Sequence, residues 1–500
     1  MTRVRADLRR TKIVSTIGPA SSDPEVLEAL IIAGMNVARM NFSHGTHEFH
    51  AQNIANVRDI SAQLGIPVAV LADLQGPKLR IGMLPEAGLD VSTGDMVRLT
   101  IDDIEGHYVE DQGEIKALIP LQYKDLPKDV GPGDRILIGD GLLELEATAS
   151  DDENIDCRVL NNGTFLSRKG INVPTAELSI PAITEKDWAD VEFILTQDID
   201  WIALSFVRKA EEVYRLKQYL TEHYGGGYPI RIISKIEKPQ AVERLSEIIE
   251  ASDGIMVARG DLGIEIPAEQ VPNVQKDMIR RCNAAGKPVI TATHLLESMT
   301  KNPRPTRAEA RDVANAILDG SDAIMTSAET ASGDYPVKAV ETMAAIAREI
   351  EKGMMSDMWR PPEHVKLVLG DVTDAVSYAS CETAHRLNAS VIIAPTASGR
   401  TARSIAKYRP HTPILAVTPN AIVQHQLVLS WGVYPLLSKR LEQTESLRED
   451  SVKRAVQSGF ARSNDRVVVT AGVANNVPGM TNLLTVEVVD EGHNEAPETI

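Results

Sequence analysis

The chain has 500 residues, of which 43% are hydrophobic, 24% are charged and only 4% are aromatic. A chain of this length favours about three domains, and its aliphatic content can fill large cores, which excludes a disordered protein. The net charge of −18 excludes nucleic acid or an anionic membrane as a partner held by the overall field of the protein. An anionic ligand would need local basic side chains, a metal ion and backbone N–H groups.

The ends of the chain and its cysteines indicate where the protein resides. The first ten residues are basic but lack the apolar core of a signal peptide, and no run of about 18 apolar residues occurs anywhere in the sequence. Cys157, Cys282 and Cys381 lie far apart without metal-type spacing, which fits a reducing compartment. We therefore expect a cytoplasmic protein with no membrane partner.

Eight apolar runs typical of buried parallel strands occur in the first two thirds of the chain, with helical patterns between most of them. They begin near Lys12, Asn36, Pro67, Asp200, Arg231, Gly254, Pro288 and Asp322. Eight strands with intervening helices predict an α/β protein with a (β/α)8 TIM barrel, whose functional residues lie at the carboxyl ends of the strands. We assign residues 1–82 and 180–352 to this barrel.

Two further regions do not follow the barrel pattern. Residues 83–179 are acidic and rich in turns, with short alternating segments, and they predict a small inserted β-barrel domain that enters from the carboxyl end of a strand and forms a lid. Residues 360–492 contain a helical pattern at 371–387 and runs at 391–396, 414–419, 433–437, 467–472 and 483–489. This series predicts a separate C-terminal α/β domain.

The candidate site begins with one β-α-β unit, residues 232–263, because its two strands end in charged residues. Lys235 and Glu237 leave the first strand, and Gly260 and Asp261 leave the second, at the same end. Two carboxylates and an ammonium group can seat Mg²⁺ together with an anionic substrate. The alternative is a pair of solvated loop acids with an ion-paired lysine. The common nucleotide-binding, metalloprotease, redox and serine-hydrolase motifs are all absent.

Other predicted strands end in polar residues that a parallel barrel places on the same rim: Arg39, Asn41, Ser43, His44, Asp73, Arg80, Thr293 and His294. Arg39 and Arg80 can clamp a phosphate, while Asn41, Ser43 and Asp73 offer oxygen ligands to a cation. Taken singly, such residues also satisfy turn backbones. We interpret His294 as a packed or capping residue.

Together these residues resemble the pyruvate kinase family. The matching segments are TIGPAS (16–21), NVARMNFSHG (36–45), KGINVP (169–174), EKDW (185–188), ALSFVR (203–208), ISKIEKP (233–239), MVARGDLGIEIP (256–267), NPRPTRAEARDVANAILDG (302–320) and SAET (327–330). The resemblance implies transfer of the phosphoryl group of phosphoenolpyruvate to ADP, which gives pyruvate and ATP. It also implies a lid, a regulatory C-terminal domain and a homotetramer.

The resemblance assigns roles on the rim. Glu237 and Asp261 would hold Mg²⁺, with Mn²⁺ as a substitute, and Lys235 would lie along the transferring phosphoryl group, which Arg39 grips. The substrate carboxylate would bind the N–H groups of Gly260 and Asp261 and the hydroxyl of Thr293. The nucleotide would contact Asn41, His44, Arg80 and, on the lid, Lys169.

Two different classes of function stay open at this stage. Barrels that place Glu and Asp on Mg²⁺ also perform aldol or phosphono-mutase chemistry on pyruvate-like substrates, and a catalytically silent metabolite sensor can keep the fold. Lys235 and the lid argue against the first alternative, and the complete rim argues against the second.

Two departures from the commonest family pattern lie beside Asp73. Potassium-dependent members typically carry Thr and Glu where this chain has Leu74 and Lys78. Leu74 offers no ligand hydroxyl, and the ammonium of Lys78 can replace a K⁺ ion near the oxygens of Asn41, Ser43 and Asp73. The alternative is that Lys78 points to solvent. We therefore expect that K⁺ is not required.

A candidate effector site follows a predicted strand of the C-terminal domain. Its residues Thr396, Ser398, Gly399, Arg400 and Thr401 precede a helical run, an arrangement suited to phosphate binding on hydroxyl and N–H groups; an ordinary strand-to-helix turn is the alternative. Similar loops in the family bind sugar phosphates or AMP. Because the later loop at 472–479 lacks Arg and Trp, we expect a sugar monophosphate or AMP rather than a bisphosphate.

Overall fold

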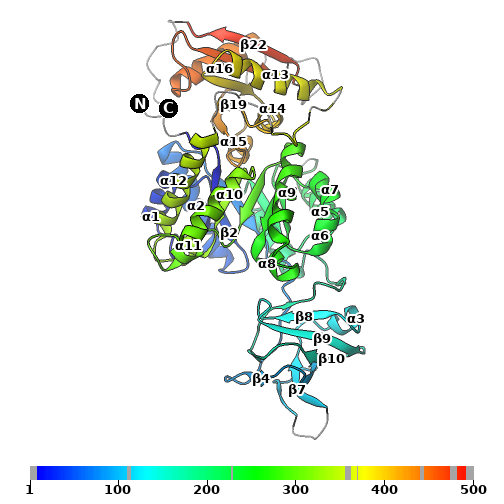
Figure 1. Cartoon of the computed structure of the whole chain (residues 1–500). Coiled ribbons are helices and arrows are strands. Elements are labelled where there is room, and N and C mark those ends of the chain that lie inside the picture. The colour runs from blue at the N-terminus through cyan, green and yellow to red at the C-terminus, as the bar shows by residue number, and fades with distance from the viewer. Residues whose placement is uncertain are drawn as a thin grey trace.

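A computed structural model describes residues 8–109, 114–226, 229–354, 362–366, 368, 370–439, 444–472 and 481–490. Figure 1 shows three parts along one axis, with the C-terminal α/β part above the barrel and the inserted β part below it. Within the described residues, no helix is long and apolar enough to cross a membrane.

The barrel is closed by eight parallel strands in the order β1-β17-β16-β15-β14-β13-β3-β2. Each expected run forms a strand, and the bounds are β1 (Lys12–Ile17), β2 (Val37–Asn41), β3 (Ala69–Asp73), β13 (Trp201–Leu204), β14 (Arg231–Ile236), β15 (Gly254–Ala258), β16 (Val289–Ala292) and β17 (Ala323–Thr326). The interior is filled by apolar side chains from these strands, Trp201 among them, together with Leu429 of the C-terminal part. The predicted (β/α)8 fold is confirmed.

Helices surround the barrel because their apolar faces pack on the strands, and polar side chains cap several helix starts. Their bounds are α1 (Pro24–Ala33), α2 (His47–Leu64), α4 (Glu185–Ile194), α5 (Ala210–His223), α6 (Pro239–Glu243), α7 (Leu245–Ala251), α8 (Arg259–Glu265), α9 (Val271–Ala285), α10 (Arg307–Leu318), α11 (Ala328–Ala331) and α12 (Pro336–Met354), with a 3₁₀ turn at Glu297–Thr300. The helical part of the β-α-β unit at 232–263, expected as one helix, is two helices, because Arg244 leaves the helical conformation with ψ at 21°.

The inserted part lies between β3 and β13 and consists of β sheets around its own apolar core. Its elements are β4 (Leu89–Val91), β5 (Met96–Thr100), β6 (His107–Tyr108), β7 (Ile115–Pro120), α3 (Leu126–Asp129), β8 (Arg135–Ile138), β9 (Leu143–Ser150), β10 (Asn154–Val159), β11 (Gly163–Phe165) and β12 (Ile171–Asn172). In Figure 1 this part lies beyond α8, which follows the carboxyl end of β15, so it is on the face where the barrel strands end.

The C-terminal part is a five-stranded sheet with helices, in the strand order β20-β19-β18-β21-β22. Four strands are parallel, and β22 pairs antiparallel with β21. The elements are α13 (Val372–Arg386), β18 (Val391–Pro395), α14 (Arg400–Ala406), β19 (Ile414–Thr418), α15 (Ala421–Leu427), β20 (Val433–Leu437), α16 (Thr444–Gln457), β21 (Arg466–Ala471) and β22 (Leu483–Val488). The predicted C-terminal α/β fold is confirmed.

Candidate active site

Lys235 is the centre of the rim at the carboxyl ends of the strands. Its Nζ donates a hydrogen bond of 2.7 Å to Ser205 Oγ, and it lies 3.0 Å from Glu237 Oε1 and 3.3 Å from Asp73 Oδ1. Burial disfavours the charge on Lys235, but the carboxylates of Asp73 and Glu237 more than offset this effect and raise its pKa above that of an ordinary lysine. The structure therefore presents a permanent ammonium group at the rim.

Glu237 is fully buried, directly after the end of β14. Its Oε2 accepts a hydrogen bond of 2.7 Å from the N–H group of Phe206, which has a φ of 53°. Burial, reinforced by the nearby carboxylate of Asp261, raises the pKa of Glu237 to about 7, although Lys235 opposes the shift. Two crowded carboxylates of this kind favour the binding of a cation between them.

The donor set fits Mg²⁺ better than a metal held by the protein alone. Within the described ranges, no group of three or more His, Cys, Asp or Glu side chains could hold a metal ion. Mg²⁺ commonly binds through one or two carboxylates and completes its six ligands with substrate oxygens and water. Glu237 and Asp261 could supply these two carboxylates, and the cleft beside Asp261 leaves space for substrate oxygens.

Arg39 lies in the middle of β2, and its side chain is held by hydrogen bonds on two sides. Its guanidinium donates to Asp73 Oδ2 at 2.7 Å and to Thr16 Oγ1 at 2.8 Å. Burial of Asp73 opposes its charge, but Lys235 and Arg39 together keep the pKa of this carboxyl below its ordinary value. Asp73 thus orients two cationic side chains toward one place, which suits a substrate phosphoryl group.

Gly260, Asp261 and Thr293 come together because the chain after β15 turns directly into α8. The N–H group of Gly260 donates to Thr293 Oγ1 at 2.7 Å, and the Arg259 side chain donates to the Thr293 carbonyl at 2.6 Å. Thr293 and His294 both have positive φ, 65° and 54°, which is costly for residues other than glycine. His294 is 62% exposed and lies 3.8 Å from Glu297, so our interpretation of a packed or capping residue is wrong.

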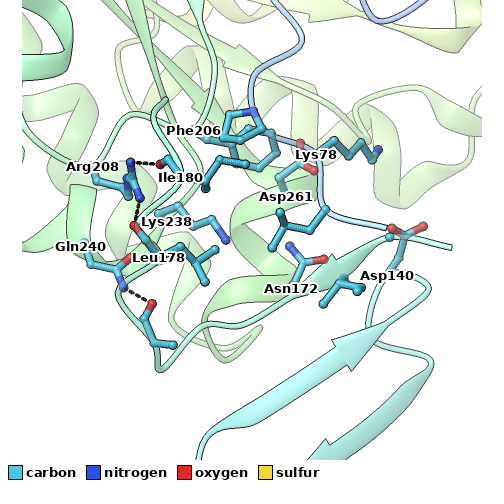
Figure 2. A pocket seen from close by; sticks show the side chains of 15 residues that line it. Lys78, Asp140, Asn172, Leu178, Ile180, Phe206, Arg208, Lys238, Gln240 and Asp261 are labelled. Carbon is cyan, nitrogen blue, oxygen red and sulfur yellow. Dashed lines mark hydrogen bonds between the residues drawn. The ribbon is translucent and has the colours of Figure 1, made fainter. Parts of the chain in front are cut away.

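The expected nucleotide residues fall into two groups. Asn41 accepts the N–H of Ser43 at 3.1 Å, and both Ser43 and His44 are exposed after β2. Arg80 donates to the carbonyl of Arg168 at 2.8 Å, which places its guanidinium beside Lys169. Arg80 and Lys169 therefore lie where the chain enters and leaves the inserted part, beside a cleft that Figure 2 shows in close view.

The structure does not bring Lys78 to the oxygens of Asn41, Ser43 and Asp73. Lys78 is exposed at the cleft, and its side chain makes no hydrogen bond or ion pair with the described residues. The oxygens of Asp73 instead contact Arg39 and Lys235. Leu74 is buried, with 1% exposure.

The expected effector residues form the turn between β18 and α14. Thr396 Oγ1 accepts the N–H of Gly399 at 3.0 Å, and Gly399 has a φ of 78° that favours glycine. The Thr401 hydroxyl lies 2.8 Å from that of Thr481. Ser398 and Arg400 are exposed, and residues 473–479 of the later loop lie outside the described residues.

Sequence reasoning missed Ser205 and Thr16, which support Lys235 and Arg39 directly. Ser205 is fully buried, receives the Lys235 hydrogen bond and donates to the Leu74 carbonyl at 2.6 Å. Its signal was a serine at the carboxyl end of a predicted strand. Thr16 carried the same signal in the first strand.

Comparison with known proteins agrees with this geometry. The family model "Pyruvate kinase, barrel domain" matches residues 8–340, and "Pyruvate kinase, alpha/beta domain" matches residues 374–487. The chain is 46% identical to the pyruvate kinase of Clostridium acetobutylicum over 484 residues, which covers 97% of this chain and 100% of that one. It is 45% identical to that of Geobacillus stearothermophilus over 486 residues, 97% and 81% of the two chains.

A solved structure is similar over nearly the whole chain. The crystal structure of a pyruvate kinase from Cryptosporidium parvum superposes with a TM-score of 0.87 at 38% sequence identity. The match covers 96% of both chains.

Proposed function

The chain belongs to the pyruvate kinase family and is a phosphotransferase of that kind, and on this premise we propose that it transfers the phosphoryl group of phosphoenolpyruvate to ADP with Mg²⁺. The observation that carries the proposal is Lys235 Nζ, which lies 3.0 Å from Glu237 and 3.3 Å from Asp73 at the open rim. A phosphoryl group in transfer needs fixed positive charge and positioning more than it needs a nucleophile.

In this proposal, Glu237 and Asp261 hold Mg²⁺ or Mn²⁺, which supplies positive charge to the substrate oxygens when it is bound. Lys235 stabilises the charge of the transferring phosphoryl group and of the enolate that remains, and Arg39 binds the phosphoryl oxygens. The substrate carboxylate binds at the start of α8, on the N–H groups of Gly260 and Asp261 and the Thr293 hydroxyl. Two crowded carboxylates and a buried ammonium in the described site support these roles.

On the nucleotide side, we propose that Asn41 and His44 from the loop after β2 bind ADP together with Arg80 and Lys169. The hydrogen bond from Arg80 to the carbonyl before Lys169 supports a shared phosphate site. Closure of the inserted part over bound ADP would exclude water and limit hydrolysis.

The direct test of the proposed function is an assay of pyruvate formation with purified protein, phosphoenolpyruvate, ADP and MgCl₂, coupled to NADH oxidation by lactate dehydrogenase. We expect turnover that disappears when ADP or the divalent ion is left out. Absence of turnover by folded protein would refute the proposal and favour a sensor. An aldol or mutase activity would instead appear without ADP.

We further propose that the activity does not require K⁺. The proposal rests on the buried Leu74, which has no hydroxyl to bind an ion, and on the Lys78 side chain, which lines the cleft. Lys78 would reach the substrate side of the cleft when the inserted part closes. The test is the initial rate in buffers of tetramethylammonium salts. A rise of about tenfold on adding KCl, equal to about 1.4 kcal/mol of barrier, would contradict the proposal.

We also propose that the turn at Thr396–Thr401 binds a sugar monophosphate or AMP that activates the enzyme. Two observations support this proposal. Gly399 adopts the positive φ that the turn requires, and the side chains of Ser398 and Arg400 are exposed. Titration of the rate with glucose 6-phosphate, ribose 5-phosphate, AMP and fructose 1,6-bisphosphate tests the choice. Activation by the bisphosphate alone would contradict it.

The remaining proposals concern organisation. We propose a cytoplasmic homotetramer with a catalytic barrel at 1–82 and 180–352, a lid at 83–179 and a regulatory domain at 360–492. Light scattering of the purified chain tests the tetramer, and a dimer or monomer at micromolar concentration would contradict it.

A further inference from the structure

One fully buried acid, Asp187, connects the two places where the chain passes between the barrel and the inserted part. It is the third residue of α4, the first helix after the chain returns to the barrel. Its Oδ2 accepts the N–H of Thr184 at 2.9 Å and the Thr184 hydroxyl at 2.6 Å. This half of the carboxylate is an ordinary helix cap.

The other half of the carboxylate makes a contact that a helix cap does not need. Asp187 Oδ1 accepts the N–H of Gly76 at 3.0 Å, across 111 residues of sequence. Gly76 lies between β3 and Leu79, where the core of the inserted part begins. One buried carboxylate therefore joins the outgoing connection at Gly76 to the returning connection at Thr184.

Gly76 in turn contacts the turn that orients the predicted catalytic groups. It has a φ of 67°, and a Cβ atom there would lie 2.8 Å from the Phe206 ring and 2.9 Å from Ser205 Cβ. Ser205 receives the hydrogen bond of Lys235, and the N–H of Phe206 binds Glu237, each at 2.7 Å. Asp187 is therefore linked through Gly76 and the Ser205–Phe206 turn to Lys235 and Glu237.

Two neighbouring side chains also hold the connections between the barrel and the inserted part. Arg208 donates to the carbonyls of Leu178 and Ile180 on the returning connection, as the dashed lines in Figure 2 show. Lys186 donates at 2.8 Å to the carbonyl of Phe42, in the loop after β2. The first turn of α4 therefore contacts the outgoing connection and the loop that carries the predicted nucleotide residues.

We propose that Asp187 is a positioning residue for the phosphoryl transfer. It holds the two connections of the inserted part in a fixed relation and seats Gly76 against the Ser205–Phe206 turn, so that Lys235 and Glu237 keep their orientation when the inserted part moves. This inference rests on the proposed function. A buried carboxylate with three donors tolerates little displacement, because an unsatisfied buried N–H group is costly.

The test compares Asp187→Asn with two matched controls in the full-length protein. The carboxamide cannot accept hydrogen bonds on both sides, so one connection loses its acceptor. Thr184→Val removes the hydroxyl of the cap but keeps the Gly76 contact, and Glu185→Gln removes an exposed acid from the same turn. A purely structural role for Asp187 predicts that Asp187→Asn behaves like Thr184→Val, with a lower melting temperature and unchanged kcat.

A positioning role predicts a different pattern. Asp187→Asn lowers kcat by about 10- to 100-fold, the size expected when reacting groups are misplaced by up to about 1 Å, while both controls keep the wild-type kcat. The second readout needs no turnover: Mn²⁺ alone binds several-fold more weakly to Asp187→Asn, measured from the electron paramagnetic resonance signal of the free ion. Hydrogen exchange becomes faster at residues 74–79 and 205–207.

Gly76→Ala places a Cβ atom against Ser205 and Phe206 and leaves Asp187 unchanged. It should reproduce the loss of kcat and of Mn²⁺ affinity. Equal kcat and equal Mn²⁺ affinity in Asp187→Asn and Thr184→Val would overturn the inference. A lower melting temperature in both variants would not change this conclusion. If the unaltered protein shows no turnover of phosphoenolpyruvate, the proposed function fails, but Mn²⁺ binding and hydrogen exchange still decide the role of Asp187.

Discussion

Replacement of Lys235 by methionine tests the electrostatic core of the site, because it removes one positive charge and keeps the length of the side chain. The Lys235 side chain is 12% exposed and lies 3.0 Å from Glu237 and 3.3 Å from Asp73. Two unit charges about 4 Å apart at an effective dielectric constant of about 20 interact by about 4 kcal/mol. If this interaction develops with the transferring charge, its loss lowers kcat by about 10³-fold.

Substrate binding should change much less than kcat in Lys235→Met. In the proposed site, Arg39 and the start of α8 would still bind the ground state, and a group that acts in the transition state affects kcat more than KM. Asp73 still accepts the hydrogen bond of Arg39, and Glu237 still accepts that of the Phe206 N–H, so the variant should fold.

The measurement is kcat and KM for phosphoenolpyruvate in the coupled assay, with the melting temperature recorded in parallel. Lys301→Met, at an exposed lysine that pairs with Asp334, is the control. A folded Lys235→Met enzyme with kcat within about tenfold of wild type, or about 1.4 kcal/mol, would refute the assigned role.

Three further predictions concern the metal, the inserted part and pH. Glu237→Ala and Asp261→Ala should each abolish turnover and weaken Mn²⁺ binding; unchanged Mn²⁺ binding would exclude them as ligands. Lys169→Ala should raise KM for ADP while leaving KM for phosphoenolpyruvate unchanged, and the reverse pattern would contradict its role. Burial lowers the pKa of His50 below its ordinary value, so the unfolded chain binds a proton that the folded chain does not, and stability falls as pH decreases below about 6.5. The loss of melting temperature between pH 7.5 and 5.5 should be smaller in His50→Gln, and an equal loss would contradict the reasoning.

Much of the fold was predictable because its signals are local. Each barrel strand is a short apolar run followed by polar residues, and every run expected from residue 12 to residue 326 forms a strand. Lys235, Glu237 and Asp261 were identifiable because the ends of neighbouring parallel strands meet on one rim. The helix break at Arg244 was not predictable from apolar spacing, since Val242 and Leu245 fit one continuous helix.

The supporting contacts could not be predicted because they join distant parts of the chain. Ser205 and Lys235 are separated by 30 residues, and Gly76 and Asp187 by 111. The motif around Asp187 explains a helix cap, but nothing local indicates that the second carboxylate oxygen binds Gly76. The sequence pattern identifies the helix cap at Thr184, whereas the hydrogen bond between Gly76 and Asp187 is seen only in the folded structure.

The contacts at the amino ends of the barrel strands bear on the proposed role of Asp187. At the amino ends of the strands, Leu429 fills the interior, while Asp322 accepts the N–H of Trp431 at 3.0 Å and the Arg409 side chain at 3.1 Å. Gln426 binds the carbonyls of Asp200 and Pro229 there as well. The interior of the barrel is packed, and the rim that carries Lys235 lies on the side of the inserted part. If Asp187 acts as proposed, the two connections of that part set the position of Lys235 and Glu237 at the rim.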